Sequence, residues 1–257
     1  MNAKIRSAGL CTGIVAVLGI HLLGPLSSPV AAASYAPNCE APNSHSVAVG
    51  VDYIRASDIT DDDFNPLERE DEIYFLVNGA IVRSGGTELI ELGERKHHNI
   101  REKREKDPWY QNVGDYWCVG DGEVLSMNVT VREDDDLPSP NIGKLIGAGA
   151  AAIGAAFGVT PLLDVAKDLA LSAAKDFVHD LEKDRVDDTL GAFMVTVSNR
   201  GGTLSYDWRP VSNARMKAYN DPDGPAYQQI TDATGAMFNL RGGPSNYTLK
   251  VSGWVPD

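Results

Sequence analysis

Basic residues are scarce in this sequence, and that scarcity excludes one large class of partners. The 257 residues include 23 Lys and Arg against 36 Asp and Glu, which gives a formal net charge of −13. Proteins that bind nucleic acid non-specifically use a basic excess to displace counterions from phosphates, and none is present here. The composition, 43% hydrophobic and 23% charged, is that of a folded protein. We therefore expect a folded protein that does not bind nucleic acid.

Motifs of catalysis are also missing. The sequence contains no G-x-S-x-G nucleophile elbow, no P-loop and no H-E-x-x-H zinc motif. The His97-His98 pair lies in a run of charged residues and has no third ligand at a recognisable spacing. The sequence therefore favours a binding module and does not favour an enzyme.

The first 33 residues have the pattern of a secretory signal. Lys4 and Arg6 precede an apolar run at 10–23, and Ala31-Ala32-Ala33 provides small residues before Ser34. This pattern predicts a signal peptide over 1–33, cleavage before Ser34, and a secreted, extracellular protein. A retained N-terminal anchor is the alternative, although polar and helix-breaking residues leave the apolar run short for a membrane span.

Cysteines are few, and two of the three remain after the signal is removed. Cys11 belongs to the segment 1–33, which leaves Cys39 and Cys118. In an oxidising compartment, two remaining cysteines predict a disulfide. In the chain-entropy model, a disulfide that closes the long loop between Cys39 and Cys118 stabilises the fold by roughly 4 kcal/mol. Neither cysteine belongs to a CxxC motif, so we do not expect a zinc site.

Apolar residues alternate with polar ones in several segments, as in half-buried strands. The segments are 47–53, 125–131, 193–197, 204–208 and 247–251. Asn199-Arg200-Gly201-Gly202 predicts a hairpin turn between the third and fourth of them. Asn78-Gly79, between two apolar runs, predicts another, because both residues tolerate positive φ. Together these signals predict a mainly β protein with an antiparallel β-sandwich fold.

A helical segment interrupts the strands. The residues 145–163 carry no charge, and small residues recur every four positions from Gly143 to Ala155, so another helix could approach closely. Thr160 and Pro161 then predict the start of a second helix. The apolar stripe of that helix is expected to contain Leu162, Ala166, Leu169, Ala173, Phe177 and Leu181. We predict a helical hairpin over 141–183. Its first helix either packs against its own protein, which we favour, or is active in a membrane.

Three acidic clusters lie next to predicted strands. The clusters are Asp58 with Asp61-Asp62-Asp63 and Asp71-Glu72; Glu133-Asp134-Asp135-Asp136; and Asp184 with Asp187-Asp188. Carboxylates that gather at one end of a sandwich repel one another, and calcium takes six to eight oxygen ligands. The clusters therefore favour calcium binding. The alternative is a solvated acidic surface that keeps an exported protein soluble.

These acidic segments resemble the calcium-binding loops of C2 domains. Ser57-Asp58 and 61–63 before Asp71-Glu72-Ile73-Tyr74 are similar to the family's first motif, although Glu72 stands where the family has proline. The run 129–136 is similar to the start of the second motif, and Asp187-Asp188-Thr189-Leu190-Gly191 is similar to its end.

The resemblance implies a C2-like sandwich in two parts, 34–140 and 184–257, with the hairpin 141–183 inserted in the third calcium-binding loop. It also implies that the hairpin lies at the membrane-facing end. The metal ligands it implies are Asp61, Asp71, Asp134, Asp136 and Asp188.

The expected function is therefore that of a secreted calcium-binding module, with calcium-dependent binding to phospholipid membranes. Two alternatives remain open. One is a pore-forming or bacteriocin-like toxin whose Gly-rich helix inserts into membranes. The other is a metal-free interaction or inhibitor module that binds another exported protein.

Overall fold

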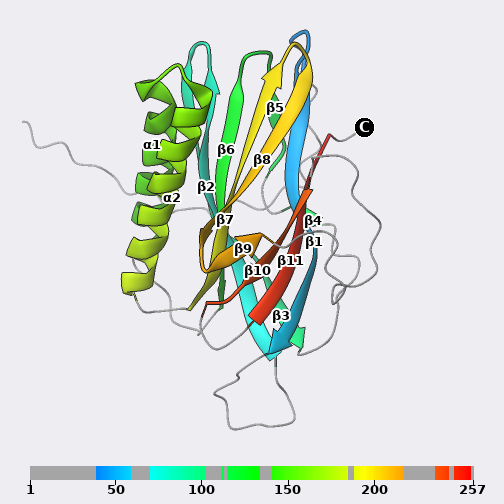
Figure 1. Cartoon of the computed structure of the whole chain (residues 1–257), viewed down its shortest axis with the longest axis vertical. Helices are drawn as coiled ribbons and strands as arrows, with labels where there is room; N and C mark the ends of the chain where they lie inside the picture. The colour runs from blue at the N-terminus through cyan, green and yellow to red at the C-terminus, as the bar shows by residue number, and fades with distance from the viewer. Residues whose placement is uncertain are drawn as a thin grey trace, which may run out of the picture. The chain divides into compact units, whose positions relative to one another are not determined.

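The computed structural model of the chain describes residues 39–58, 70–101, 111–112, 115–133, 141–184, 188–216, 235–242 and 246–255. The chain divides into two units, Met1–Ala33 and Ser34–Asp257, and every described residue belongs to the second. The predicted signal peptide over 1–33 therefore lies outside the described residues. Two antiparallel sheets and two helices make up the described part of the second unit (Figure 1).

One sheet has six strands in the described residues. Its order is β4-β1-β11-β10-β9, and β5 also pairs with β1. The bounds are β1 His45–Asp58, β4 Gln111–Asn112, β5 Trp117–Val119, β9 Ala214–Met216, β10 Gly235–Leu240 and β11 Asn246–Trp254. The predicted strands at 47–53 and 247–251 are confirmed as β1 and β11. A register shift between Val51 and Tyr53 moves the buried face of β1 onto Ile54 and Ala56.

The other sheet has five strands in the order β3-β2-β6-β7-β8. The bounds are β2 Glu70–Arg83, β3 Gly86–Arg101, β6 Val124–Glu133, β7 Thr189–Arg200 and β8 Thr203–Ser212. The predicted hairpin between β7 and β8 is confirmed. Its turn residues Gly201 and Gly202 have φ of 60° and 81°, which suits a tight turn between twisted strands.

The turn predicted at Asn78-Gly79 is wrong. Both residues lie inside β2, and the chain turns at Ser84-Gly85 instead. Asn78 is fully buried and pairs in register with Asn128 of β6. Gly79 lies so close to Ser126 that a Cβ there would collide with the backbone oxygen of Ser126. Asn78 and Gly79 therefore pack against β6 and do not form a turn. The pairing of β2 with β3 extends to Arg101.

The two sheets face each other across a hydrophobic core. The core includes Val47 and Leu249 from the six-stranded sheet, together with Phe75 and Val129 from the five-stranded sheet. Phe193 of β7 stacks on Phe238 of β10 with ring centroids 4.9 Å apart, which joins the two layers. The predicted mainly β, antiparallel sandwich is confirmed.

The two helices, α1 Ile142–Val159 and α2 Leu163–Asp184, lie between β6 and β7 in the sequence, within two residues of the predicted bounds. They pack on the five-stranded sheet, on the face away from the six-stranded sheet (Figure 1). The residues of this second apolar cluster include Tyr74, Leu76, Ala192 and Met194 from the strands and Ile146, Ile153, Phe177, Val178 and Leu181 from the helices. The sheet is thus covered on both faces. The favoured prediction, that the first helix packs against its own protein, is confirmed.

The predicted apolar stripe of α2 is only partly right. Ala166, Phe177 and Leu181 are buried as expected, but Leu169 is 40% exposed. Leu162, which precedes the helix, is 64% exposed. The other buried positions are Ala170, Ala174 and Val178. Ala166, Ala170 and Ala174 face the protein because small side chains let this part of the helix pack closely, so Leu162 and Leu169 are left outside.

The hairpin runs along the sheet from one end to the other. Gly149 of α1 lies against Asn78, while Gly154 lies against Ala80 and Thr87, so α1 runs toward the β2–β3 turn. Its beginning is at the other end, because the chain enters α1 from the end of β6. The α1–α2 turn therefore lies at the end of the sheet opposite to the end of β6 and the beginning of β7. The position of the hairpin at a membrane-facing end stays a prediction.

Candidate functional site

Most of the predicted metal ligands fall where no side chain is described. Asp61, Asp134 and Asp136 lie outside the described residues, and for Asp71 only the backbone, in β2, is described. Asp188 is described and exposed, directly before β7. In the described part of the chain, no group of three or more His, Cys, Asp and Glu side chains could hold a metal ion. The calcium site stays a prediction.

Strand register makes neighbours of three strand ends that adjoin acidic segments in the sequence, and we call this end of the five-stranded sheet the acidic edge. Ile73 of β2 pairs with Glu133 of β6, and the Glu133 backbone N–H donates to the Asp188 carbonyl oxygen at 3.0 Å. The beginning of β2, the end of β6 and the beginning of β7 are therefore neighbours. Asp71 precedes the first pair by two residues, and 134–136 directly follow the second strand.

The exposed face of α1 carries no charge over most of its length. From Leu145 to Leu163 the chain has no Asp, Glu, Lys or Arg. The exposed residues of that stretch of α1 are Ala148, Ala151, Ala152, Ala155, Gly158 and Val159. A surface helix of a soluble protein normally directs polar residues to water. Among the described helices, α1 alone is long and apolar enough to cross a membrane, with 33% of its residues buried.

Large apolar side chains gather where α1 meets α2. Val159 is 74% exposed, Leu162 64%, Val165 44% and Leu169 40%. We call these four residues the hairpin tip. They make up most of the large exposed apolar side chains of the described residues; the others are Leu89, Met216 and Val255. The uncharged face of α1 therefore continues into an exposed apolar end.

A shallow groove separates the two helices on their solvent side. Its volume is about 520 Å³, and its lining is mostly Ala and Gly from α1, with Leu169 and Phe177 from α2. Asp176 and Asp180 of α2 also line it. A hydrogen bond from Lys183 lowers the pKa of the Asp180 carboxyl group. The positive charge of Lys183 lowers it further, by a smaller amount. The groove floor, by contrast, contains no ionisable group from α1.

Beneath the hairpin the sheet is unusually polar. The side chains of β6 that face the helices are Ser126, Asn128, Thr130 and Arg132, and all are fully buried. Thr196 of β7 and Asn78 of β2 extend this polar strip to the neighbouring strands. We call these six residues the polar strip. The sequence alone predicts solvent-facing residues at alternate positions of a strand, and it contains no signal that helices cover them.

Five residues of the polar strip are joined by hydrogen bonds within the sheet. Ser126 Oγ lies 3.1 Å from Thr196 Oγ1, and Asn128 Nδ2 donates to Asn78 Oδ1 at 3.0 Å. Asn128 Nδ2 also donates to Thr130 Oγ1 at 3.0 Å. Within the Asn78–Asn128 pair, the buried atoms Asn78 Nδ2 and Asn128 Oδ1 make no hydrogen bond with the described protein. A buried polar atom without a partner destabilises the arrangement that buries it.

Ion pairs at the protein surface join α2 to β8. Lys167 Nζ lies 3.3 Å from Asp207 Oδ2, and Arg209 contacts Asp168 at 2.5 Å and Asp207 at 3.0 Å. Burial of Arg209 opposes its charge. The hydrogen bonds and charges of Asp168 and Asp207 outweigh that effect and raise the pKa of the guanidinium group. Partly exposed pairs of this kind contribute little stability each.

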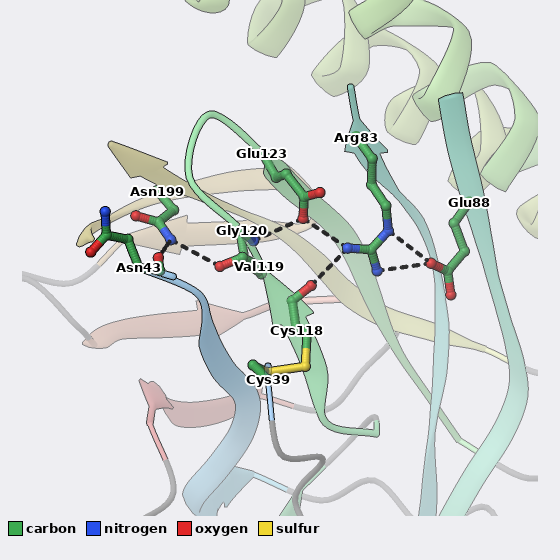
Figure 2. Close-up of a disulfide and its surroundings, with 9 residues drawn as sticks. All are labelled: Cys39, Asn43, Arg83, Glu88, Cys118, Val119, Gly120, Glu123 and Asn199. Atoms are coloured by element: carbon green, nitrogen blue, oxygen red, sulfur yellow. Dashed lines mark hydrogen bonds and ion pairs between the residues drawn. A yellow bond between two sulfur atoms is a disulfide. The ribbon is translucent and has the colours of Figure 1, made fainter. Parts of the chain in front are cut away.

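The predicted disulfide between Cys39 and Cys118 is confirmed, with Cα atoms 5.6 Å apart (Figure 2). It ties the segment before β1 to β5. Nearby, Arg83 donates to the Cys118 carbonyl oxygen at 3.1 Å and to Glu123 at 2.7 Å. Asn199 Nδ2 donates to the carbonyl oxygens of Asn43 at 2.6 Å and Val119 at 2.9 Å (Figure 2). These contacts hold the neighbouring segments together, so we assign the disulfide region a structural role.

The sequence and structure together thus offer two candidate sites at opposite ends of the five-stranded sheet, an acidic edge and an uncharged helical surface with an apolar tip. Comparison of the chain with protein-family models, with curated protein sequences and with solved structures found no match.

Proposed function

We propose that this chain is an exported, non-enzymatic module that binds phospholipid membranes through the helical hairpin. The observation that carries this proposal is the uncharged outer face of α1, which continues into the exposed tip residues Val159 and Leu162. Apolar surface that is already exposed gains free energy on transfer from water into a lipid interface. Export is supported by the signal pattern over 1–33 and by the disulfide.

The distribution of charge also supports binding with the hairpin tip toward the membrane. The protein has a net charge of −13, and an anionic membrane would repel most of its surface. The acidic runs 134–136 and 187–188 adjoin the edge of the sheet from which the hairpin tip points away. A membrane at the tip would therefore be remote from the strongest negative charge, and we expect binding without calcium.

Vesicle co-sedimentation of the purified protein tests this function, with vesicles of phosphatidylcholine in calcium and in chelator. The variant Val159→Asp with Leu162→Asp is expected to reduce binding by about tenfold or more, because each charge would have to enter the lipid interface. Met216→Asp is the control, since Met216 is 52% exposed on β9, which follows Asn213, a residue in contact with Glu182 at the end of α2 opposite to the tip. Equal binding by the two variants would contradict the proposal. Absence of binding by the unaltered protein would favour a module that binds another exported protein.

Calcium binding at the acidic edge is a second candidate function. It is favoured by the strand register, which makes the beginning of β2, the end of β6 and the beginning of β7 neighbours. The C2-like identification belongs to this candidate. Acidic segments next to one sheet edge support it, and so does a hairpin between β6 and β7, which pair directly. Calcium would then stabilise the fold from the end opposite to the membrane.

A further inference from the structure

We propose a further activity, which rests on the membrane binding proposed above: at a membrane the hairpin leaves the five-stranded sheet, and α1 inserts into the hydrocarbon and permeabilises the bilayer. Surface binding needs only the exposed face of α1. Insertion needs the buried face as well, so the packing of the hairpin against the sheet determines whether α1 can insert.

The five-stranded sheet keeps part of its own hydrogen bonding when the two helices move away. Residues of the polar strip form hydrogen bonds between strands, between Ser126 and Thr196 and between Asn128 and Asn78. Those bonds would survive the departure of the helices. The surface then exposed would combine the Ser, Thr and Asn side chains of the polar strip with apolar residues such as Tyr74 and Met194, so it would be less apolar than an ordinary core face.

The closed arrangement also contains a specific defect. Asn78 Nδ2 and Asn128 Oδ1 are buried without hydrogen-bond partners in the described protein. The backbone of α1 passes directly over the first, since a Cβ on Gly149 would collide with the Asn78 amide. Both atoms would regain hydrogen bonds to water once the hairpin moved away. Opening therefore relieves a desolvation penalty that closure imposes.

The hairpin suits the bilayer as its new environment. At 1.5 Å per residue, the 18 residues of α1 span about 27 Å, close to the roughly 30 Å of a hydrocarbon core. The helix is uncharged from Leu145 onward, and its Gly and Ala positions allow close helix contacts in lipid. α2 carries charges along its outer face and fits the interface beside it.

A disulfide staple between α1 and β2 tests the need for opening. A Cβ built on Gly154 lies 3.3 Å from Ala80 Cβ, near the separation that disulfides adopt. It would also meet Thr87 Cγ2 at 2.9 Å, so Thr87→Ser is introduced into every protein compared. The staple is Ala80→Cys with Gly154→Cys. The controls are the Thr87→Ser protein and the Gly154→Cys single variant, each assayed with and without reductant.

Dye leakage from phosphatidylcholine vesicles is measured alongside co-sedimentation. We expect the oxidised staple to bind vesicles like its control while its leakage activity falls by about tenfold or more, with recovery on reduction. Leakage by the oxidised staple equal to that of its control would overturn the inference. The Thr87→Ser control, assayed in reductant, reveals any effect from opening the Cys39–Cys118 bond.

Thiol labelling gives a second measurement that does not depend on leakage. Ser126 is fully buried in the polar strip, so Ser126→Cys should react with a maleimide only when the hairpin is away from the sheet. We expect vesicles to raise its labelling rate by about tenfold or more. Thr203→Cys, at an exposed position, controls for lipid effects on the reagent.

The two proposals fail in different ways. If the unaltered protein does not sediment with vesicles, the proposed membrane-binding function fails and the insertion activity with it. If it sediments but causes no leakage, and Ser126→Cys labels at the same rate with and without vesicles, only the insertion activity is overturned.

Discussion

Gly149 determines how closely α1 can approach the sheet. A Cβ at this position would collide with the Asn78 amide and lie 2.8 Å from Phe177 Cδ2. We predict that Gly149→Ala lowers the free energy of unfolding by about 1–3 kcal/mol, because the buried neighbours must shift to make room. Denaturant unfolding followed by circular dichroism measures the change.

Gly143 provides the matched control for that substitution. It lies in the first turn of the same helix, and a Cβ there meets nothing within 4 Å. Gly143→Ala should leave stability unchanged or raise it by up to about 1 kcal/mol, through the better helix propensity of alanine. Equal destabilisation by the two variants would contradict the assigned contact of Gly149 with the sheet.

The Asn78–Asn128 pair offers a second test at the residue scale. Asn128→Leu alone removes the donor to Asn78 Oδ1 and leaves that oxygen buried without its partner. Asn78→Leu with Asn128→Leu removes both amides and both unpartnered atoms. We predict that the double variant is more stable than Asn128→Leu by about 1–2 kcal/mol, as a double-mutant cycle of unfolding free energies would measure. Additive effects of the two substitutions would contradict this coupling.

Some residue-scale features could be predicted from the sequence and others could not. The Cys39–Cys118 disulfide follows from counting, since only two cysteines remain beyond the signal pattern. The turn predicted at Asn78-Gly79 was wrong because the same two residues can form either a tight turn or a buried amide beside a close backbone contact. Which of the two forms depends on Ser126 and Asn128, far away along the chain.

At the scale of elements, the hairpin and the sandwich can be separated experimentally. The end of β6 and the beginning of β7 are adjacent, since the Glu133 N–H donates to the Asp188 carbonyl oxygen at 3.0 Å. A variant in which a short linker replaces 134–187 should therefore still fold as a β-sandwich. It should be less stable than the whole chain, because Tyr74, Leu76 and Met194 lose their helical cover.

Cooperative unfolding and a near-ultraviolet circular dichroism signal measure whether that variant is folded. If the hairpin carries the membrane contact, the same variant should no longer sediment with vesicles. A variant that fails to fold would mean that the helices are part of the folding core. A folded variant that still binds vesicles would relocate the membrane contact to the sandwich.

Element types were more predictable than element faces. The two-residue alternation at 125–131 and the uncharged run at 145–163 correctly predicted β6 and α1. The buried face of α2 was predicted wrongly in part, because large side chains were expected inside. Ala170 and Ala174 occupy the contact with the protein, and Leu169 lies outside. Close packing of small residues depends on the partner surface, which periodicity does not reveal.

At the scale of the whole molecule, the orientation of the hairpin is the feature that sequence could not provide. A run of 18 helical residues can lead away from a sheet or lie along it, with the same periodicity. Here α1 lies along the five-stranded sheet, so the apolar tip and the acidic edge are separated by the length of the helix. The expected joint action of calcium and hairpin at one membrane-facing end therefore becomes two separate proposals.

Calcium at the acidic edge is testable by melting. We predict that calcium raises the melting temperature of the protein relative to chelator. A site with millimolar affinity, occupied at about ten times its dissociation constant, adds about 1.4 kcal/mol, which corresponds to about 3–5 °C for a chain of this size. Differential scanning calorimetry in both conditions measures the shift.

Substitution then distinguishes a bound ion from general screening of negative charge. Asp134→Asn with Asp136→Asn removes two of the expected ligands and should abolish the calcium shift. Asp164→Asn with Asp176→Asn removes the same charge from exposed positions on α2, so it should keep the shift. Loss of the shift in both pairs would indicate screening, because diffuse charge effects depend on the number of charges and not on their position. An identical melt of the unaltered protein in calcium and in chelator would contradict calcium binding altogether, and the acidic segments would then be a solvated surface.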